Sequence, residues 1–129
     1  MRLAREKCRT RVTRAAESGY PPALVTYALS LRDRGGAEAE RARSLLERAA
    51  KTGYYPAITE LADCLEHGTC GTTDQQAAMS WVRVSRLLKQ SNKIPTDDLE
   101  HWDSRIRAML QPTQIADAEI TARNLVGGM

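Results

Sequence analysis

The chain has 129 residues, of which 42% are hydrophobic and 5% aromatic, and a formal net charge of +3. This length fits one domain, 1–129, that buries a core of its own. No apolar run approaches the roughly 18 residues of a membrane span and no apolar signal-peptide segment is visible, so we expect no membrane span and a cytoplasmic location, or a periplasmic one if a leader was removed.

The first predicted element is a helix over residues 2–18, where apolar side chains recur at spacings of three and four. Residues 1–18 hold six basic and two acidic side chains, whereas the rest of the chain holds thirteen and fourteen. Such a helix is either a solvated terminal face or a contact for nucleic acid or acidic membrane, which steep salt dependence would reveal. No aromatic residue stands among these bases to stack on a nucleobase, so we expect no nucleic-acid partner.

Glycine and proline mark the ends of the next helices. Gly19 closes the first helix, and Pro21-Pro22 opens the second, an arrangement typical of helix boundaries. A loop over 68–72 precedes Thr73 or Asp74, either of which can cap the following helix. A linker over 90–96 comes later. The predicted helices after the first are 22–34, 37–52, 56–68, 75–90, 97–110 and 112–126.

The stretch from Cys8 to Ala23 recurs 34 residues later, from Ala42 to Ala57. This period is typical of helix-pair repeats, in which no unit buries its apolar face alone and neighbours stack into a solenoid. The sequence therefore predicts an all-α solenoid of antiparallel helix pairs with about seven helices. Its parts are a half-repeat or cap helix (1–18), repeat one (19–52), repeat two (53–90) and a C-terminal capping helix pair (96–126).

These repeats resemble the Sel-one-like repeat, a relative of the tetratricopeptide repeat. Ala28 and Ala62 replace a glycine usual in that pattern, and Val84-Ser85 replaces an Ala-Ala pair, so the second repeat ends irregularly. The matching residues of repeat one are Ala23, Tyr27, Ala28, Leu31, Gly35, Ala42, Leu45, Ala49, Ala50 and Gly53. Those of repeat two are Ala57, Leu61, Ala62, Leu65, Gly68, Gly71, Asp74, Ala78 and Trp81.

The resemblance implies an adaptor or scaffold that binds another protein, in bacterial secretion, signalling or envelope processes. Some members of the family look like immunity proteins that block a secreted effector, which is the first alternative. A second is a hydrolase like the cysteine-rich, penicillin-binding members, although their disulfide spacing differs from that of this chain. Fold alone does not decide among these functions.

The helices that open each repeat are expected to line the concave surface. Opposite the core stripe, the helical wheel places an apolar strip, Val25 and Leu29, beside an acidic end, which suits an extended or helical peptide. The alternative is that this strip packs against the neighbouring helix. The candidate partner-binding residues are Val25, Thr26, Leu29, Asp33, Thr59, Glu60, Asp63 and His67.

Cys64, His67 and Cys70 are spaced like part of a metal site, but zinc needs four ligands and only Cys8 and His101 remain to complete it. The other interpretations are two free thiols or a Cys64–Cys70 disulfide that pins the loop to its helix. Three cysteines leave at least one unpaired within the chain. We predict no metal and no cofactor.

No nucleophile, base and orienting group stand in a recognisable catalytic pattern, so we expect no enzyme. Asp97, Asp98 and Asp103 are interpreted as first-turn and solvent-facing carboxylates. Trp81 and Trp102 occupy core-facing helical positions. The sequence thus predicts a non-catalytic module whose partner is another protein, such as a secreted effector or a peptide segment.

Overall fold

The computed structural model describes residues 13–129. Cys8 and the basic residues from Arg2 to Arg11, and with them the predictions for most of the first helix, lie outside the described residues. Residues 13–17 are helical, and no strand occurs between residues 13 and 129. The helices are α2 (Pro21–Arg34), α3 (Gly36–Ala50), α4 (Tyr55–His67), α5 (Gln75–Ser91), α6 (Asp97–Arg107) and α7 (Pro112–Gly127). The all-α class with about seven helices is therefore confirmed.

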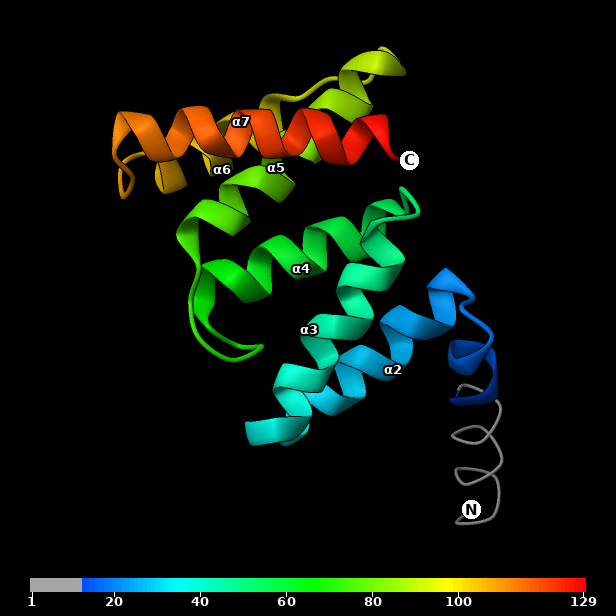
Figure 1. The fold of residues 1–129 in the computed structure, drawn as a ribbon. Coiled ribbons are helices and arrows are strands. Elements are labelled where there is room, and N and C mark those ends of the chain that lie inside the picture. The colour runs from blue at the N-terminus through cyan, green and yellow to red at the C-terminus, as the bar shows by residue number, and fades with distance from the viewer. Residues whose placement is uncertain (1–12) are drawn as a thin grey trace.

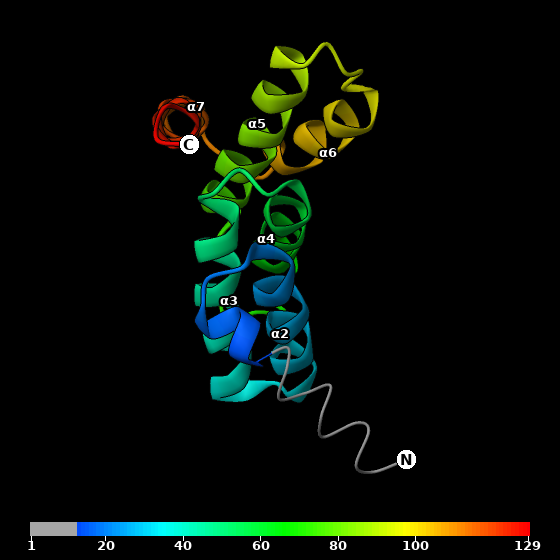
Figure 2. The same ribbon diagram turned by 90° about the vertical axis from the view of Figure 1, so that its right-hand side faces the viewer.

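The helices form two layers. Each of α2 to α5 packs against the next helix along the chain, α7 packs against α5, and α2 also touches α4. Figure 2 shows α2, α4 and α6 on one side and α3 and α5 on the other, with α7 outside α5. We call α2, α4 and α6 the A layer, and α3, α5 and α7 the B layer. The stack thus alternates between layers along the chain.

The 34-residue recurrence is repeated in the backbone. Gly19 and Gly53 have φ of 86° and 87°, a left-handed conformation that glycine adopts without steric cost. Tyr20 and Tyr54 then adopt the same extended conformation at the N-caps of α2 and α4, ahead of the opening prolines. The two inter-repeat turns are built alike because the same residues build them.

Small side chains fill the contacts between helices. Ala28, Ala42, Ala49, Ala50, Ala57, Ala62 and Ala78 are all fully buried. A methyl side chain lets two helix backbones approach closely, and larger residues such as Leu24, Leu46 and Leu61 fill the space between these contacts. Each fully buried leucine contributes roughly 1.5–3 kcal/mol of transfer free energy. This core explains the low aromatic content of the chain.

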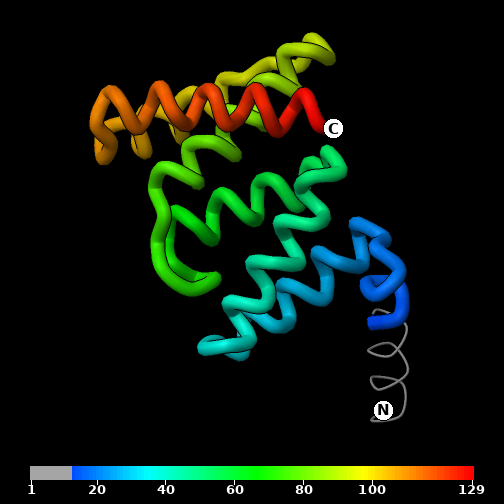
Figure 3. Tube along the Cα trace, in the orientation of Figure 1, coloured from blue at the N-terminus to red at the C-terminus, as the bar shows by residue number. Residues whose placement is uncertain are grey.

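The last two helices do not form a hairpin with each other. They begin where predicted, but α6 and α7 each pack on α5, from opposite sides (Figure 2). The chain crosses the edge of α5 through the turn after α6 and returns along its other side, as the tube in Figure 3 shows. Ala118 and Ala122 of α7 are fully buried at this contact. The two C-terminal helices therefore pack on α5 from both sides, an arrangement that we call the clamp, and not mainly on each other.

Candidate functional site

The predicted partner-binding residues lie on α2 and α4, in the A layer. We call this solvent-facing surface the A face. Asp33 and Asp63 are its most accessible acids, with side chains 78% and 52% exposed, and the side chain of His67 is 53% exposed. Thr26 is exposed, and Leu29, Thr59 and Glu60 are half-buried. Seven of the eight predicted residues thus reach solvent on one surface.

Val25 differs from the expectation, because it is buried and belongs to the hydrophobic core. Leu29 packs against the same core and keeps only part of its surface. The apolar strip read from the helical wheel therefore packs inward, as the alternative interpretation held. The exposed side chains of the A face are polar and include the acids Asp33 and Asp63.

An ion pair fixes α2 against α4 across the A face. Arg32 Nη1 donates to Glu60 Oε2 at 3.1 Å, while Arg32 Nε lies 3.9 Å from a carboxylate oxygen of Asp33. The Arg32 guanidinium therefore stands between two carboxylates, and the exposed Arg34 follows Asp33 in the last turn of α2. The sequence analysis missed Arg32, whose partner is 28 residues away.

Glu66 ties α4 to α6 at the neighbouring edge. Its carboxylate accepts from Arg105 Nε and Nη2, both at 2.8 Å, and from Trp102 Nε1 at 2.9 Å. The bond from Arg105 holds the pKa of the Glu66 carboxyl below its usual value, against the opposing effect of burial, and Trp102 adds to the lowering. This buried carboxylate orients α6 beside the A face.

The structure brings together Asp63, Glu66 and His67, whose potential ligand atoms lie within 4.8 Å of one another. Both Glu66 oxygens are already engaged by Arg105 and Trp102. A structural zinc site also needs four ligands. His67 Nδ1 instead lies 3.3 Å from Asp63 Oδ1 and 3.2 Å from the Asp63 carbonyl oxygen. We assign no metal to this group.

Cys64 and Cys70 are joined in a disulfide, with Cα atoms 5.2 Å apart, and both are buried. The bond holds the loop after α4 against the helix, next to the end of the A face. Asp74 Oδ1 accepts from Ala77 N at 3.0 Å, so Asp74 is the N-cap of α5. Cys64 and Cys70 are the two cysteines among residues 13–129, and neither has a free thiol for catalysis or for metal binding.

Asp103 corrects another prediction, since it is 1% exposed instead of solvent-facing. It accepts from Arg83 Nε at 2.7 Å and also pairs with Arg107. Arg83 in turn donates to Glu119 of α7 at 2.9 Å. Burial alone would lower the pKa of Arg83, but its bond to Glu119 and its pairing with Asp103 outweigh burial and raise it. This network links α5 to both α6 and α7.

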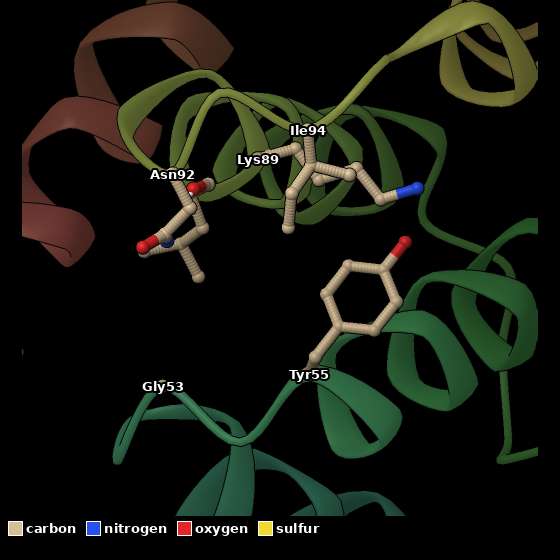
Figure 4. A pocket seen from close by; sticks show the side chains of 6 residues that line it. Gly53, Tyr55, Lys89, Asn92 and Ile94 are labelled. Carbon is tan, nitrogen blue, oxygen red and sulfur yellow. Dashed lines mark hydrogen bonds between the residues drawn. The ribbon is translucent and has the colours of Figure 1, made fainter.

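A separate pocket of about 320 Å³ lies at the other end of α4, next to the α3–α4 turn. Figure 4 shows the Tyr55 ring facing Ile94 across it, with Lys89 and Asn92 on either side. Gly53 and Leu88 complete the wall. Lys89 Nζ lies 5.3 Å from the centre of the Tyr55 ring and donates to Asp98. Most of the wall of this pocket is apolar.

The described site residues are held by ion pairs and hydrogen bonds within the chain. No described helix is both long and apolar enough to cross a bilayer. Comparison with models of known protein families, with curated proteins and with solved structures found no match to this chain.

Proposed function

We propose that the chain is a non-catalytic, protein-binding repeat module of the Sel-one-like type, which acts as an adaptor or as an inhibitor of its partner. The observation that supports this most is the A face itself. Its side chains lie on two helices that the Arg32–Glu60 pair joins, and fully buried alanines pack these helices closely into the stack. A surface already held in place loses little conformational entropy on binding, which favours affinity.

The inhibitor version of this proposal is an immunity protein that neutralises a secreted effector. The exposed acids Asp33 and Asp63 of the A face support it, because electrostatic complementarity speeds association and excludes wrong partners. An adaptor and an immunity protein differ in what the partner does when it is bound. Loss of the partner's activity on addition of the purified chain supports the immunity version, and unchanged activity supports the adaptor.

We further propose that the protein works in an oxidising compartment, and so favour the periplasmic location over the cytoplasmic one. The Cys64–Cys70 disulfide supports this, because such bonds persist where thiols are not kept reduced. Alkylation of the protein in intact cells, followed by mass measurement, tests it. Labelling of Cys64 and Cys70 without prior reduction would contradict the proposal.

The experiment for the binding function compares two variants in affinity capture from the native cell extract. Thr26→Tyr adds a bulky side chain to the A face, and Thr121→Tyr adds the same group to α7. The two threonines are matched, because each is exposed and bonds its hydroxyl to the carbonyl four residues earlier at 3.0 Å. We expect Thr26→Tyr alone to lose the partner. Equal retention by both variants would contradict binding at the A face.

A further inference from the structure

A smaller pocket, of about 120 Å³, lies where residues 13–17 meet α2 and α3. We call it the Tyr27 pocket. Its apolar lining consists of the buried Ala16 and of Tyr27 and Leu45, which are half-buried and pack against the core. None of the eight predicted residues of the A face lines it. The Tyr27 pocket is therefore separate from the surface already described.

A comparison of the two repeats explains why space remains at this position. Leu45 follows the buried Ala42 by three residues, as Trp81 follows the buried Ala78 in repeat two. Trp81 is 6% exposed and belongs to the core. A leucine in place of a tryptophan leaves volume unfilled, because the surrounding helices relax only partly around a smaller side chain. The Tyr27 pocket thus corresponds to the space that an aromatic ring fills in repeat two.

Two arginines of the pocket wall have no acidic partner in the described part of the chain. Seven of the arginines between residues 13 and 129 pair with carboxylates, whereas Arg41 and Arg48 form no ion pair there and are exposed. The guanidinium carbon of Arg41 lies 5.8 Å from the centre of the Tyr27 ring, a cation–π contact that holds it at the pocket. Glu17 also lines the wall, so the two arginines leave one positive charge in excess.

We propose that the Tyr27 pocket is a second protein-interaction site, which receives an aromatic side chain flanked by a carboxylate from a partner segment. A cavity of about 150 Å³ is enough to hold benzene, so a pocket of about 120 Å³ that reaches the exposed Arg41 and Arg48 takes most of one ring. Tyr27 packs against that ring, and a guanidinium group bonds to the carboxylate beside it. Because the A face plays no part, this site goes beyond the proposed function and is tested independently of it.

The variant Leu45→Trp tests the origin of the pocket. Its indole should fill the empty space as Trp81 does in repeat two, so the urea midpoint should equal or exceed that of the native chain. The control is Leu125→Trp, which adds the same bulk at another half-buried leucine that packs against the core but lines neither pocket. Overpacking there should lower the midpoint. A similar fall for Leu45→Trp would overturn the proposal.

Binding is measured by fluorescence anisotropy with three fluorescein-labelled peptides. Each is a short Gly-Ser segment with a different centre, either Asp-Trp-Asp, Asp-Ala-Asp or Asn-Trp-Asn. We expect the Asp-Trp-Asp peptide to bind the native chain about tenfold more tightly than the Asp-Ala-Asp peptide, because loss of an aromatic anchor removes much of the binding energy. Its advantage over the Asn-Trp-Asn peptide should be smaller, up to about fivefold, as for an exposed ion pair.

The same variants locate the site. Leu45→Trp should weaken binding of the Asp-Trp-Asp peptide about tenfold, because its own indole occupies the pocket, whereas Leu125→Trp should change it less than about twofold. Arg48→Gln should weaken it up to about fivefold. Its control is Arg34→Gln, which removes another exposed arginine, in the last turn of α2, and should have less than about a twofold effect.

No measurable binding of the Asp-Trp-Asp peptide, or equal affinity for the Asp-Trp-Asp and Asp-Ala-Asp peptides, would overturn the proposal. An equal loss in Leu45→Trp and Leu125→Trp would also overturn it. Sedimentation tests a second copy of the chain as the occupant. Self-association of the native chain that Leu45→Trp abolishes would assign the pocket to that copy and reject the acidic, aromatic partner.

Discussion

Single charged residues occupy two kinds of position in this molecule, which their burial distinguishes. Asp103 and Glu66 are almost fully enclosed and hold helices together. The side chains of Asp33 and Asp63 are more than half exposed to solvent. A buried carboxylate that loses its partners is costly, whereas an exposed one changes stability little. The same residue type therefore holds helices together at one position and faces solvent at another.

The Asp103→Asn variant tests the structural role. It removes the charge that Arg83 and Arg107 share, while Glu119 still accepts from Arg83. We expect a loss of about 3 kcal/mol in the free energy of unfolding, at the low end for a broken buried pair because one acceptor remains. Urea denaturation measures it. The exposed Asp117→Asn should stay within about 0.5 kcal/mol of the native chain, and a similar small effect for Asp103→Asn would contradict the burial.

Glu66 predicts a dependence of stability on acid. Its pKa is lower in the folded chain than in the unfolded chain, chiefly through the bond from Arg105. The unfolded state therefore binds the proton first, and the stabilisation present above the unfolded pKa of about 4.3 is lost as pH falls through the folded pKa. Glu66→Gln should be less stable than the native chain at pH 7, and the difference should shrink between pH 5 and pH 3. Thermal unfolding across that range measures it, and a constant difference would contradict the prediction.

At the scale of elements, the turns follow directly from the sequence. Gly19, Gly53 and Gly68 all end helices with positive φ, and each predicted helix after the first begins within two residues of its observed start. Glycine and proline act locally, so their signals survive without knowledge of the tertiary structure.

The spacing of residues in the sequence was sufficient to predict the burial of Asp103. Leu99, Asp103 and Ile106 follow helical spacing, and all three are buried in α6. In contrast, the sequence around Glu66 does not predict its hydrogen-bond partners, because Trp102 and Arg105 lie 36 and 39 residues further along the chain. Nor does the wheel of a single helix tell whether Val25 faces solvent or a neighbour. Such contacts depend on how elements meet.

The loop between α4 and α5 should owe part of its stability to the disulfide. The bond closes a short loop, with a sequence separation of six. Loop-closure entropy for a loop of this size amounts to roughly 2 kcal/mol. The Cys64→Ala, Cys70→Ala variant should lose about that much in the free energy of unfolding, measured by urea denaturation. Dithiothreitol should lower the free energy of unfolding of the native chain to the same value. No effect of the reductant on the native chain, together with no effect of the variant, would contradict the bond.

Residues 13–129 form a helical stack in which α6 and α7 both pack on α5 at one end. The chain after α5 passes on both sides of that helix, and the network from Arg83 reaches α6 through Asp103 and α7 through Glu119. Because neighbouring units of a repeat stack stabilise each other, losing a terminal unit weakens the next one. The A layer is therefore held by contacts well away from the A face.

Removal of α7 by ending the chain at Gln111 tests this coupling. The truncation exposes the surface of α5 that Ala118 and Ala122 cover, and it takes one acceptor from Arg83. We expect a lower urea midpoint, a smaller slope and increased binding of a hydrophobic dye. Ending the chain at Gly127 is the control. An unchanged, cooperative transition after loss of α7 would show that the clamp does not stabilise the stack.

The measurement that tests the binding function most directly is photo-crosslinking in the native host. A photoreactive amino acid replaces Ser30, exposed on α2 at the border of the A face, or Ser44, exposed on α3 of the opposite layer. We expect one covalent adduct with another protein from position 30 and none from position 44. An adduct from position 44 alone, or no adduct from position 30 in cells that retain the partner, would contradict recognition through the A face.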